Sequence, residues 1–104
     1  MYANEADVIN VALFGMTAKE WKDNNPDLVG NIRDYTDILH LIVLSNLEVI
    51  NASMIDNNIN QSERLEKLNV TARKELSILS NDRNILDIEK MDNDISQKLI
   101  DSNN

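Results

Sequence analysis

The residue types that most often carry acid–base or metal chemistry are scarce in this chain. Histidine occurs once, at His40, and cysteine is absent from all 104 residues. His40 lies within Ile38–Leu44, the most apolar stretch of the sequence, and a lone histidine in such a stretch is usually packed or hydrogen-bonded. We therefore expect His40 to be a core residue and not a catalytic base or a metal ligand. The missing thiols exclude disulfides and cysteine-based zinc sites.

Carboxylates are abundant, with 18 Asp and Glu residues, but their spacing does not predict a site. The acidic runs Asp87–Glu89 and Asp92–Asp94 lack the glycine and the terminal glutamate of a calcium-binding loop, and they fall in a helical pattern. The sequence also has no glycine-rich phosphate loop and no serine in a nucleophile elbow. We interpret the carboxylates as a solvated helix face. We expect a protein that is not an enzyme and that binds no metal and no cofactor.

Two residues ahead of the longest apolar segment are candidates for binding a partner protein. Arg33 and Tyr35 belong to types that are enriched at the energetic centres of protein interfaces. In the alternative interpretation, Arg33 forms a salt bridge at the start of a helix and Tyr35 covers the edge of the core. The sequence leaves both interpretations open.

A second group of candidates is basic. Four cations fall on one predicted helix and could contact phosphates: Arg64, Lys67, Arg73 and Lys74. Three glutamates are interleaved with them: Glu63, Glu66 and Glu75. This alternation is typical of a salt-bridged solvent face and less typical of a nucleic-acid-binding patch.

The overall charge limits the choice of partners. The formal net charge is −8 and the isoelectric point is near 4.4, so the field of the whole chain repels nucleic acids and anionic membrane surfaces. There is no run of about 18 apolar residues and no signal-like N-terminal segment. We expect a cytoplasmic protein that makes no contact with membranes. The acidity serves solubility or complements a basic partner surface.

The elements that carry these residues are predicted to be helices. Two Gly and one Pro are few for this length, and aromatic residues make up only 4% of the chain, so we expect a few long helices with an aliphatic core. The first helix covers Asn4–Phe14 and ends at Gly15 as a left-handed cap. The second opens with the capping box Thr17–Glu20, carries Trp21 and stops before Pro26.

A long central helix is predicted to begin at Asp34 or Thr36 and to end near residues 56–58. Its first two turns, Ile38–Leu44, are apolar nearly all round, which is typical of a helix that other helices surround. We also expect Phe14 and Trp21 in the core. The stretch Leu28–Gly30 is interpreted as a turn with two apolar anchors.

The central helix is followed by a second long helix that Asn60 or Ser62 caps. Its apolar residues recur at spacings of three and four: Leu65, Leu68, Ala72, Leu76 and Leu79. Because the connecting loop is short, the two helices are expected to form an antiparallel hairpin.

The C-terminal stretch carries a narrower stripe, here called the tail stripe. Its apolar residues recur about once per turn in an otherwise charged segment: Ile85, Ile88, Met91, Ile95 and Leu99. A helix of this length is marginal in water when isolated, so the tail stripe must pack on its own domain or on a second chain. Residues 101–104 are expected to fray.

Several ordered segments of the chain are similar to a known family. Asp7–Trp21, Gly30–Tyr35, Leu44–Glu48 and Gln61–Asn69 resemble the C-terminal helical region of bacterial and phage-type KilA-N domain proteins, which are described as DNA-binding or antirepressor-like. The resemblance covers roughly residues 2–80. It implies that the DNA-reading KilA-N domain would precede this region, so the family's DNA-contacting residues have no counterparts here. The chain would be a fragment or a shortened product that serves as the accessory part.

The sequence therefore predicts a small all-α fold with two parts. Residues 1–80 form a helical accessory domain with a long central helix and an antiparallel helical hairpin, and residues 81–104 form a C-terminal helical extension. We expect a non-catalytic oligomerisation domain of a phage-related DNA-binding regulator, whose partners are a second copy of the chain and a regulatory protein. Two alternatives are direct nucleic-acid binding through the four cations, and a free-standing acidic protein of the antitoxin or DNA-mimic type.

Overall fold

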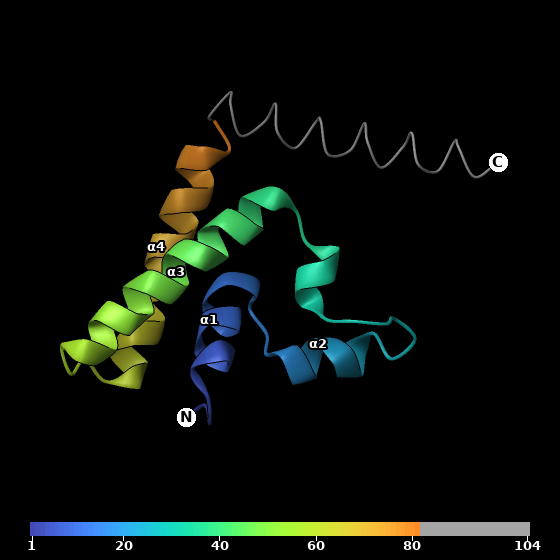
Figure 1. Ribbon diagram of the computed structural model, residues 1–104, viewed down its shortest axis with the longest axis horizontal. Helices are drawn as coiled ribbons and strands as arrows, with labels where there is room; N and C mark the ends of the chain where they lie inside the picture. Colours follow the sequence, from blue (N-terminus) through green and yellow to red (C-terminus); the bar gives the residue numbers. More distant parts are fainter. Residues whose placement is uncertain (82–104) are drawn as a thin grey trace.

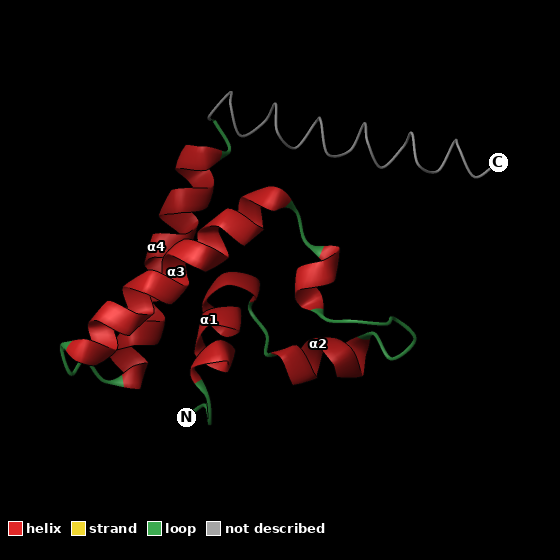
Figure 2. Cartoon of the chain, in the orientation of Figure 1, coloured by secondary structure: helices red, strands yellow, loops and turns green. Residues whose placement is uncertain are grey.

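The computed structural model describes residues 1–81, and these residues confirm the all-helical fold. The elements in chain order are α1 (Glu5–Phe14), α2 (Ala18–Asn24), the 3-10 helix η1 (Ile32–Tyr35), α3 (Ile38–Asp56) and α4 (Gln61–Leu79). The described part of the chain contains no strand (Figures 1 and 2). The predicted extension covers residues 81–104; apart from Asn81 it lies, with the whole tail stripe, outside the described residues.

Most of the helix starts lie where the sequence predicts them, and side-chain caps define them. The Asn4 side chain accepts a hydrogen bond from the Asp7 amide at the start of α1, and Asn60 accepts one from the Glu63 amide at the start of α4. Thr17 and Glu20 form the predicted reciprocal capping box at α2. Gly15 closes α1 with a left-handed φ of 76°.

The start of α3 differs from the prediction. Neither Asp34 nor Thr36 begins the central helix, because Ile32–Tyr35 forms a separate 3-10 turn with its own capping box between Asn31 and Asp34. The backbone is then extended at Thr36, with φ −100° and ψ 173°. Asp37 is the true cap of α3, since its carboxylate accepts the His40 amide hydrogen at 2.8 Å.

Helices α1, α3 and α4 pack into a bundle. The polar contacts between them show the relative direction of each helix. Asn51 of α3 contacts Arg64 of α4, and Asn46 contacts Glu75, so the two helices are antiparallel. This confirms the predicted hairpin. Helix α1 lies along both helices (Figure 1) and runs parallel to α4, because Glu5 contacts Arg64 while the Ala12 carbonyl accepts from Asn69.

The bundle core is aliphatic, as the composition predicts. It is built from one face of each helix: Val8, Ile9 and Ala12 of α1, Val43, Leu44, Leu47 and Met54 of α3, and Leu68 and Ala72 of α4. Phe14 packs against this core from its edge. The expectation that Ile38–Leu44 is surrounded is wrong for the described residues. Only Val43 and Leu44 of this stretch are buried, because α1 and α4 leave the outer side of the first turns open, and Leu41 is exposed.

Helix α2 and η1 form an arm beside the bundle (Figure 2). Trp21 is buried as predicted, but its ring packs on Tyr35 of η1 with the centroids 5.4 Å apart and lies outside the bundle core. Leu28 and Val29 are exposed. The prediction that they anchor a turn is therefore wrong, and the α2–η1 connection is held by the aromatic pair and by its polar caps.

Helix α3 is long and apolar enough to cross a membrane by length and composition alone, with 19 residues and a mean hydropathy of 1.7. Four of its apolar side chains, Val43, Leu44, Leu47 and Met54, lie in the core with α1 and α4, whereas Leu41, Val49 and Ile55 are exposed. It also carries Asn51, which is buried and bonded to charged side chains of both neighbours. The same composition is expected of the central helix of a bundle.

Leu68 gives a direct test of this packing, because its side chain is 0% exposed at the centre of the bundle core. We expect Leu68→Ala to lower the free energy of unfolding by about 2–5 kcal/mol through lost burial and a residual cavity. Urea denaturation measures the change. The control is Val49→Ala on the exposed side of α3, which should change stability by less than about 0.5 kcal/mol. Equal effects of the two substitutions would contradict this core.

Candidate functional site

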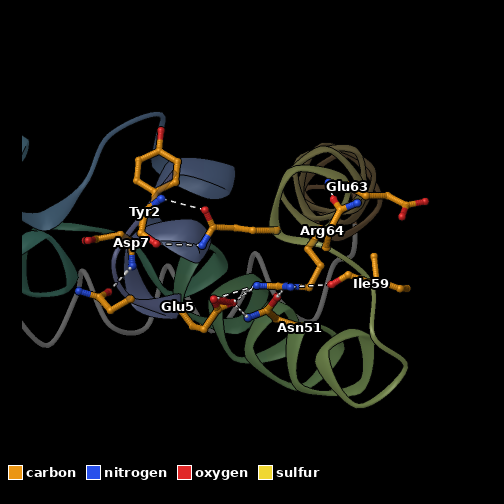
Figure 3. Close-up of polar contacts among 10 residues, drawn as sticks. Tyr2, Glu5, Asp7, Asn51, Ile59, Glu63 and Arg64 are labelled. Carbon is orange, nitrogen blue, oxygen red and sulfur yellow. Dashed lines mark hydrogen bonds and ion pairs between the residues drawn. The ribbon is translucent and has the colours of Figure 1, made fainter.

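The main polar feature of the bundle is a buried arginine. Arg64 of α4 is only 8% exposed. Its Nη2 atom donates to both carboxylate oxygens of Glu5 at 2.6 and 2.8 Å, its Nε donates to Asn51 Oδ1 at 3.0 Å, and its Nη1 donates to the Ile59 carbonyl at 2.6 Å. Asn51 Nδ2 also donates to Glu5, at 3.0 Å. One guanidinium therefore joins α1, α3 and the α3–α4 loop to α4 (Figure 3).

A second pair of bonds extends this arginine network to the N-terminus. The Tyr2 amide donates to Gln61 Oε1 at 2.8 Å, and Gln61 Nε2 donates to the Tyr2 carbonyl at 2.9 Å (Figure 3). Gln61 is the first residue of α4, one turn before Arg64. The first residues of the chain are thus held against the start of α4.

The sequence contains a signal for this network in the spacing of its polar residues. Arg64 precedes Leu68 and Ala72 at spacings of four, so it occupies a position of the apolar stripe of α4. Asn51 lies four residues after Leu47 and three before Met54, on the buried face of α3. A polar residue on the apolar face of a helix is buried and needs hydrogen-bond partners inside the fold. The identity of these partners depends on where α1 packs, and the spacing of residues within one helix does not predict the position of α1.

The structure removes Arg64 from the set of candidate phosphate contacts. Its guanidinium is inside the bundle and bonded to three partners, so the interpretation of Arg64 as part of a solvent face is wrong. Lys67, Arg73 and Lys74 are exposed on α4. Lys67 Nζ lies 3.6 Å from a carboxylate oxygen of Glu63 one turn earlier, as the alternating charges predict.

Arg33 and Tyr35 lie on η1 and are partly engaged within the chain. Arg33 Nη2 forms a 2.7 Å ion pair with Glu48 of α3. The Tyr35 hydroxyl donates to the Val29 carbonyl at 2.6 Å, and its ring packs on Trp21. Both side chains remain about half exposed. Arg33 thus forms a salt bridge to the middle of α3 and not at the start of a helix, and Tyr35 covers Trp21 and not the edge of the bundle core, so the alternative interpretation is only partly right. A role in partner binding stays a prediction.

His40 is hydrogen-bonded and packed, but its side chain is 32% exposed and lies outside the bundle core, so the expectation of a core histidine is wrong. Its Nδ1 atom lies 2.6 Å from Asp37 Oδ1, and its ring stacks on Phe14 with the centroids 6.0 Å apart. Desolvation raises the pKa of the Asp37 carboxyl, but the hydrogen bonds from the His40 amide and ring, together with the His40 charge, outweigh it and hold this pKa below its ordinary value. The pair fixes the first turn of α3. In residues 1–81, no group of three or more His, Asp or Glu side chains is placed to hold a metal ion.

The hairpin carries an open groove of about 520 Å³, here called the hairpin groove. Its apolar lining comes from Ile50 and Met54 of α3 and from Val70 of α4. Val70 is 62% exposed, so an apolar surface faces solvent here. Charged side chains of α4 also line the groove: Glu63, Glu66 and Lys67. An apolar channel with a charged border is the form that an amphipathic helix fits.

The ion pair of the buried Arg64 can be compared with that of the half-exposed Arg33. The two carboxylates are similarly exposed, 40% for Glu5 and 45% for Glu48, so the pairs differ mainly in the burial of the arginine. We expect Glu5→Ala to destabilise the fold by about 3 kcal/mol, because it leaves the buried Arg64 cation without its counter-ion. The matched control is Glu48→Ala, which removes the half-exposed partner of Arg33 and should cost less than about 1 kcal/mol. Chemical denaturation of both variants gives the two values. If Glu5→Ala cost no more than Glu48→Ala, the arginine network would not be a stabilising feature.

The network also predicts how stability depends on pH. The pKa of the Glu5 carboxyl lies below its ordinary value of 4.5, and the hydrogen bond from Asn51 is the largest cause. Desolvation raises this pKa, but the Asn51 bond together with the hydrogen bonds and charge of Arg64 outweighs it. The pKa of Glu5 is lower in the folded chain than in the unfolded chain. The contribution of Glu5 to the free energy of unfolding is therefore fully present above the unfolded-state pKa, and it is lost as the pH falls through the folded-state pKa. The stability difference between wild type and Glu5→Gln should therefore shrink between pH 7 and pH 3. A constant difference across this range would contradict the assignment.

Comparison of the chain with protein-family models, with curated proteins and with solved structures finds no match. The resemblance to the KilA-N family is not tested by this result and stays a prediction.

Proposed function

We propose that this chain is a non-catalytic assembly domain that acts by protein–protein contact and forms a dimer. The observation that carries the proposal is the apolar surface that the hairpin leaves open. Val70, which lines the hairpin groove, and Ile78, eight residues further along α4, are 62% and 58% exposed, in a chain whose sequence is strongly acidic. Exposed apolar side chains with polar borders are typical of interaction surfaces. The tail stripe supplies a second apolar surface that needs a partner.

The fixed geometry of the bundle supports the same role. The arginine network ties α1, α3 and α4 together through hydrogen bonds to a charged group, and such bonds are among the stronger ones in proteins. A partner would therefore meet a surface that is already ordered, which lowers the entropic cost of association.

The proposed setting is a phage-related DNA-binding regulator in the cytoplasm, and its support is the resemblance of four sequence segments to KilA-N proteins. In this setting DNA is read by another domain, and the present chain joins subunits or holds a regulatory protein. The net charge of −8 agrees with a domain that does not itself contact phosphates. Direct nucleic-acid binding is the weaker alternative, because Arg64 is committed to the interior and glutamates flank the remaining cations of α4.

The proposal predicts the solution mass of the full chain. Light scattering across a concentration series should give a dimer, and Ile88→Asp with Ile95→Asp should convert it to a monomer, because two buried charges oppose apolar association. High salt should not dissociate the dimer, since apolar contacts are not screened.

The control is Val49→Asp, which adds the same charge to an exposed side of α3 and should leave the mass unchanged. A wild-type chain that stays monomeric at every concentration would contradict dimerisation. A complex that forms with a basic protein and dissociates in salt would favour the acidic-mimic alternative.

A further inference from the structure

Helix α4 presents one complete side to solvent, here called the outer face of α4. The buried residues Arg64, Leu68 and Ala72 recur at spacings of four, so at 3.6 residues per turn the opposite side is centred on Val70. The hairpin groove runs along one border of this face, and a second groove of about 300 Å³ between α1 and α4 runs along the other. The outer face consists of exposed residues only: Glu63, Glu66, Lys67, Val70, Arg73, Lys74 and Ser77.

The charges of the outer face differ between its two halves. Glu63 and Glu66 lie in the first half of α4, together with Lys67, which pairs with Glu63. Arg73 and Lys74 lie in the second half. Within residues 1–81, none of Glu66, Arg73 and Lys74 forms an ion pair. The outer face therefore has an uncompensated anion near its start and two uncompensated cations towards its end.

A face with opposite charges in its two halves is complementary to a second copy of itself. When two such faces meet antiparallel across a two-fold axis, the first half of each lies opposite the second half of the other, and matching edges lie together. Glu66 and Arg73 lie on the same edge, about 40° and 60° from Val70 at 3.6 residues per turn. In a register centred on Asn69, Arg73 of one copy is offset from Glu66 of the other by about 1.5 Å along the helix axis.

The same register also matches the other charges and the apolar centre. Lys74 of one copy is offset from Glu63 of the other by about 1.5 Å along the axis. Glu63 remains available to it, because the 3.6 Å contact with Lys67 is longer than a hydrogen bond. The two Val70 side chains meet near the two-fold axis, beside the apolar lining of both hairpin grooves. In such a contact the charges set the orientation and register more than the affinity.

We propose that two copies of the chain pair through the outer face of α4, antiparallel and across a two-fold axis centred near Asn69. The interface is then isologous, as in most homodimers. This inference rests on the proposed function, because it requires that the chain dimerises, and it adds the surface and the register of the dimer.

Charge reversal in the full-length chain tests this register. Glu66→Arg brings two pairs of like charges together in the dimer, and so does Arg73→Glu, so each substitution should raise the dimer dissociation constant roughly tenfold or more. Circular dichroism should show unchanged helix content, since neither side chain has an ion-pair partner within residues 1–81. The effect of each reversal on the dissociation constant should diminish in high salt, because exposed charges are screened.

A mixture of the two variants provides the decisive measurement. Every contact between Glu66→Arg and Arg73→Glu chains again joins opposite charges, so a heterodimer should form in preference to either homodimer. Light scattering with one variant made longer by a tag detects it, and the double variant Glu66→Arg/Arg73→Glu should regain the wild-type dissociation constant. The matched control is Asp27→Arg at an exposed position of the α2–η1 connection, which changes the charge equally and should leave the dissociation constant unchanged.

The outcomes separate the two proposals. Weak self-association of each single variant with a stable mixed dimer supports pairing through α4. A dimer that neither substitution weakens, or a mixture without a preferred heterodimer, overturns the α4 interface while dimerisation stands. If Arg73→Glu alone weakens the dimer, the cation contacts a different segment, and the register is overturned as well. A wild-type chain that is monomeric at every concentration defeats the proposed function itself.

Discussion

The arrangement of the bundle depends on the need to compensate the Arg64 guanidinium. A cation inside a bundle is tolerated only when counter-charge and acceptors surround it. Glu5 of α1 supplies the charge, Asn51 of α3 supplies one acceptor, and the Ile59 carbonyl supplies another. These groups meet at one point only when α1 lies parallel to α4 and α3 lies antiparallel to it. Apolar burial is non-directional, whereas these hydrogen bonds require fixed positions of their donors and acceptors, so the polar cluster restricts the register of the helices more sharply than the aliphatic core does.

Much of the fold could be predicted because its signals are local. The Asn4 and Asn60 caps, the Thr17–Glu20 box and the left-handed Gly15 each depend on residues within one turn, and the hairpin follows from two apolar stripes and a short loop. The start of α3 was missed because Asp34 and Asp37 are both good caps, and only the closed 3-10 turn at Ile32–Tyr35 separates them.

The candidate site was less accessible to sequence reasoning because it depends on contacts between distant segments. Arg64 was assigned to the solvent with its charged neighbours, although its spacing from Leu68 places it on the buried face. The hairpin groove was not predicted, since Ile50 and Val70 come together only through the crossing of α3 and α4. The tail stripe was visible in sequence, because a narrow apolar period needs no structure to be recognised. A stripe alone does not identify its partner surface.

The parallel docking of α1 on α4 has a consequence for the order in which the fold forms. The contacts of Tyr2 with Gln61 and of Glu5 with Arg64 each join residues that are 59 positions apart. During synthesis α1 is made before α3 and α4, but it has no complete docking surface until α4 has been added. The hairpin needs only short loop closure and can form as soon as α4 emerges, whereas α1 must close a long loop to join it. Of the three bundle helices, the one made earliest is therefore the last to be secured, and until then its apolar face at Val8, Ile9 and Ala12 is open to chaperones or to another nascent chain.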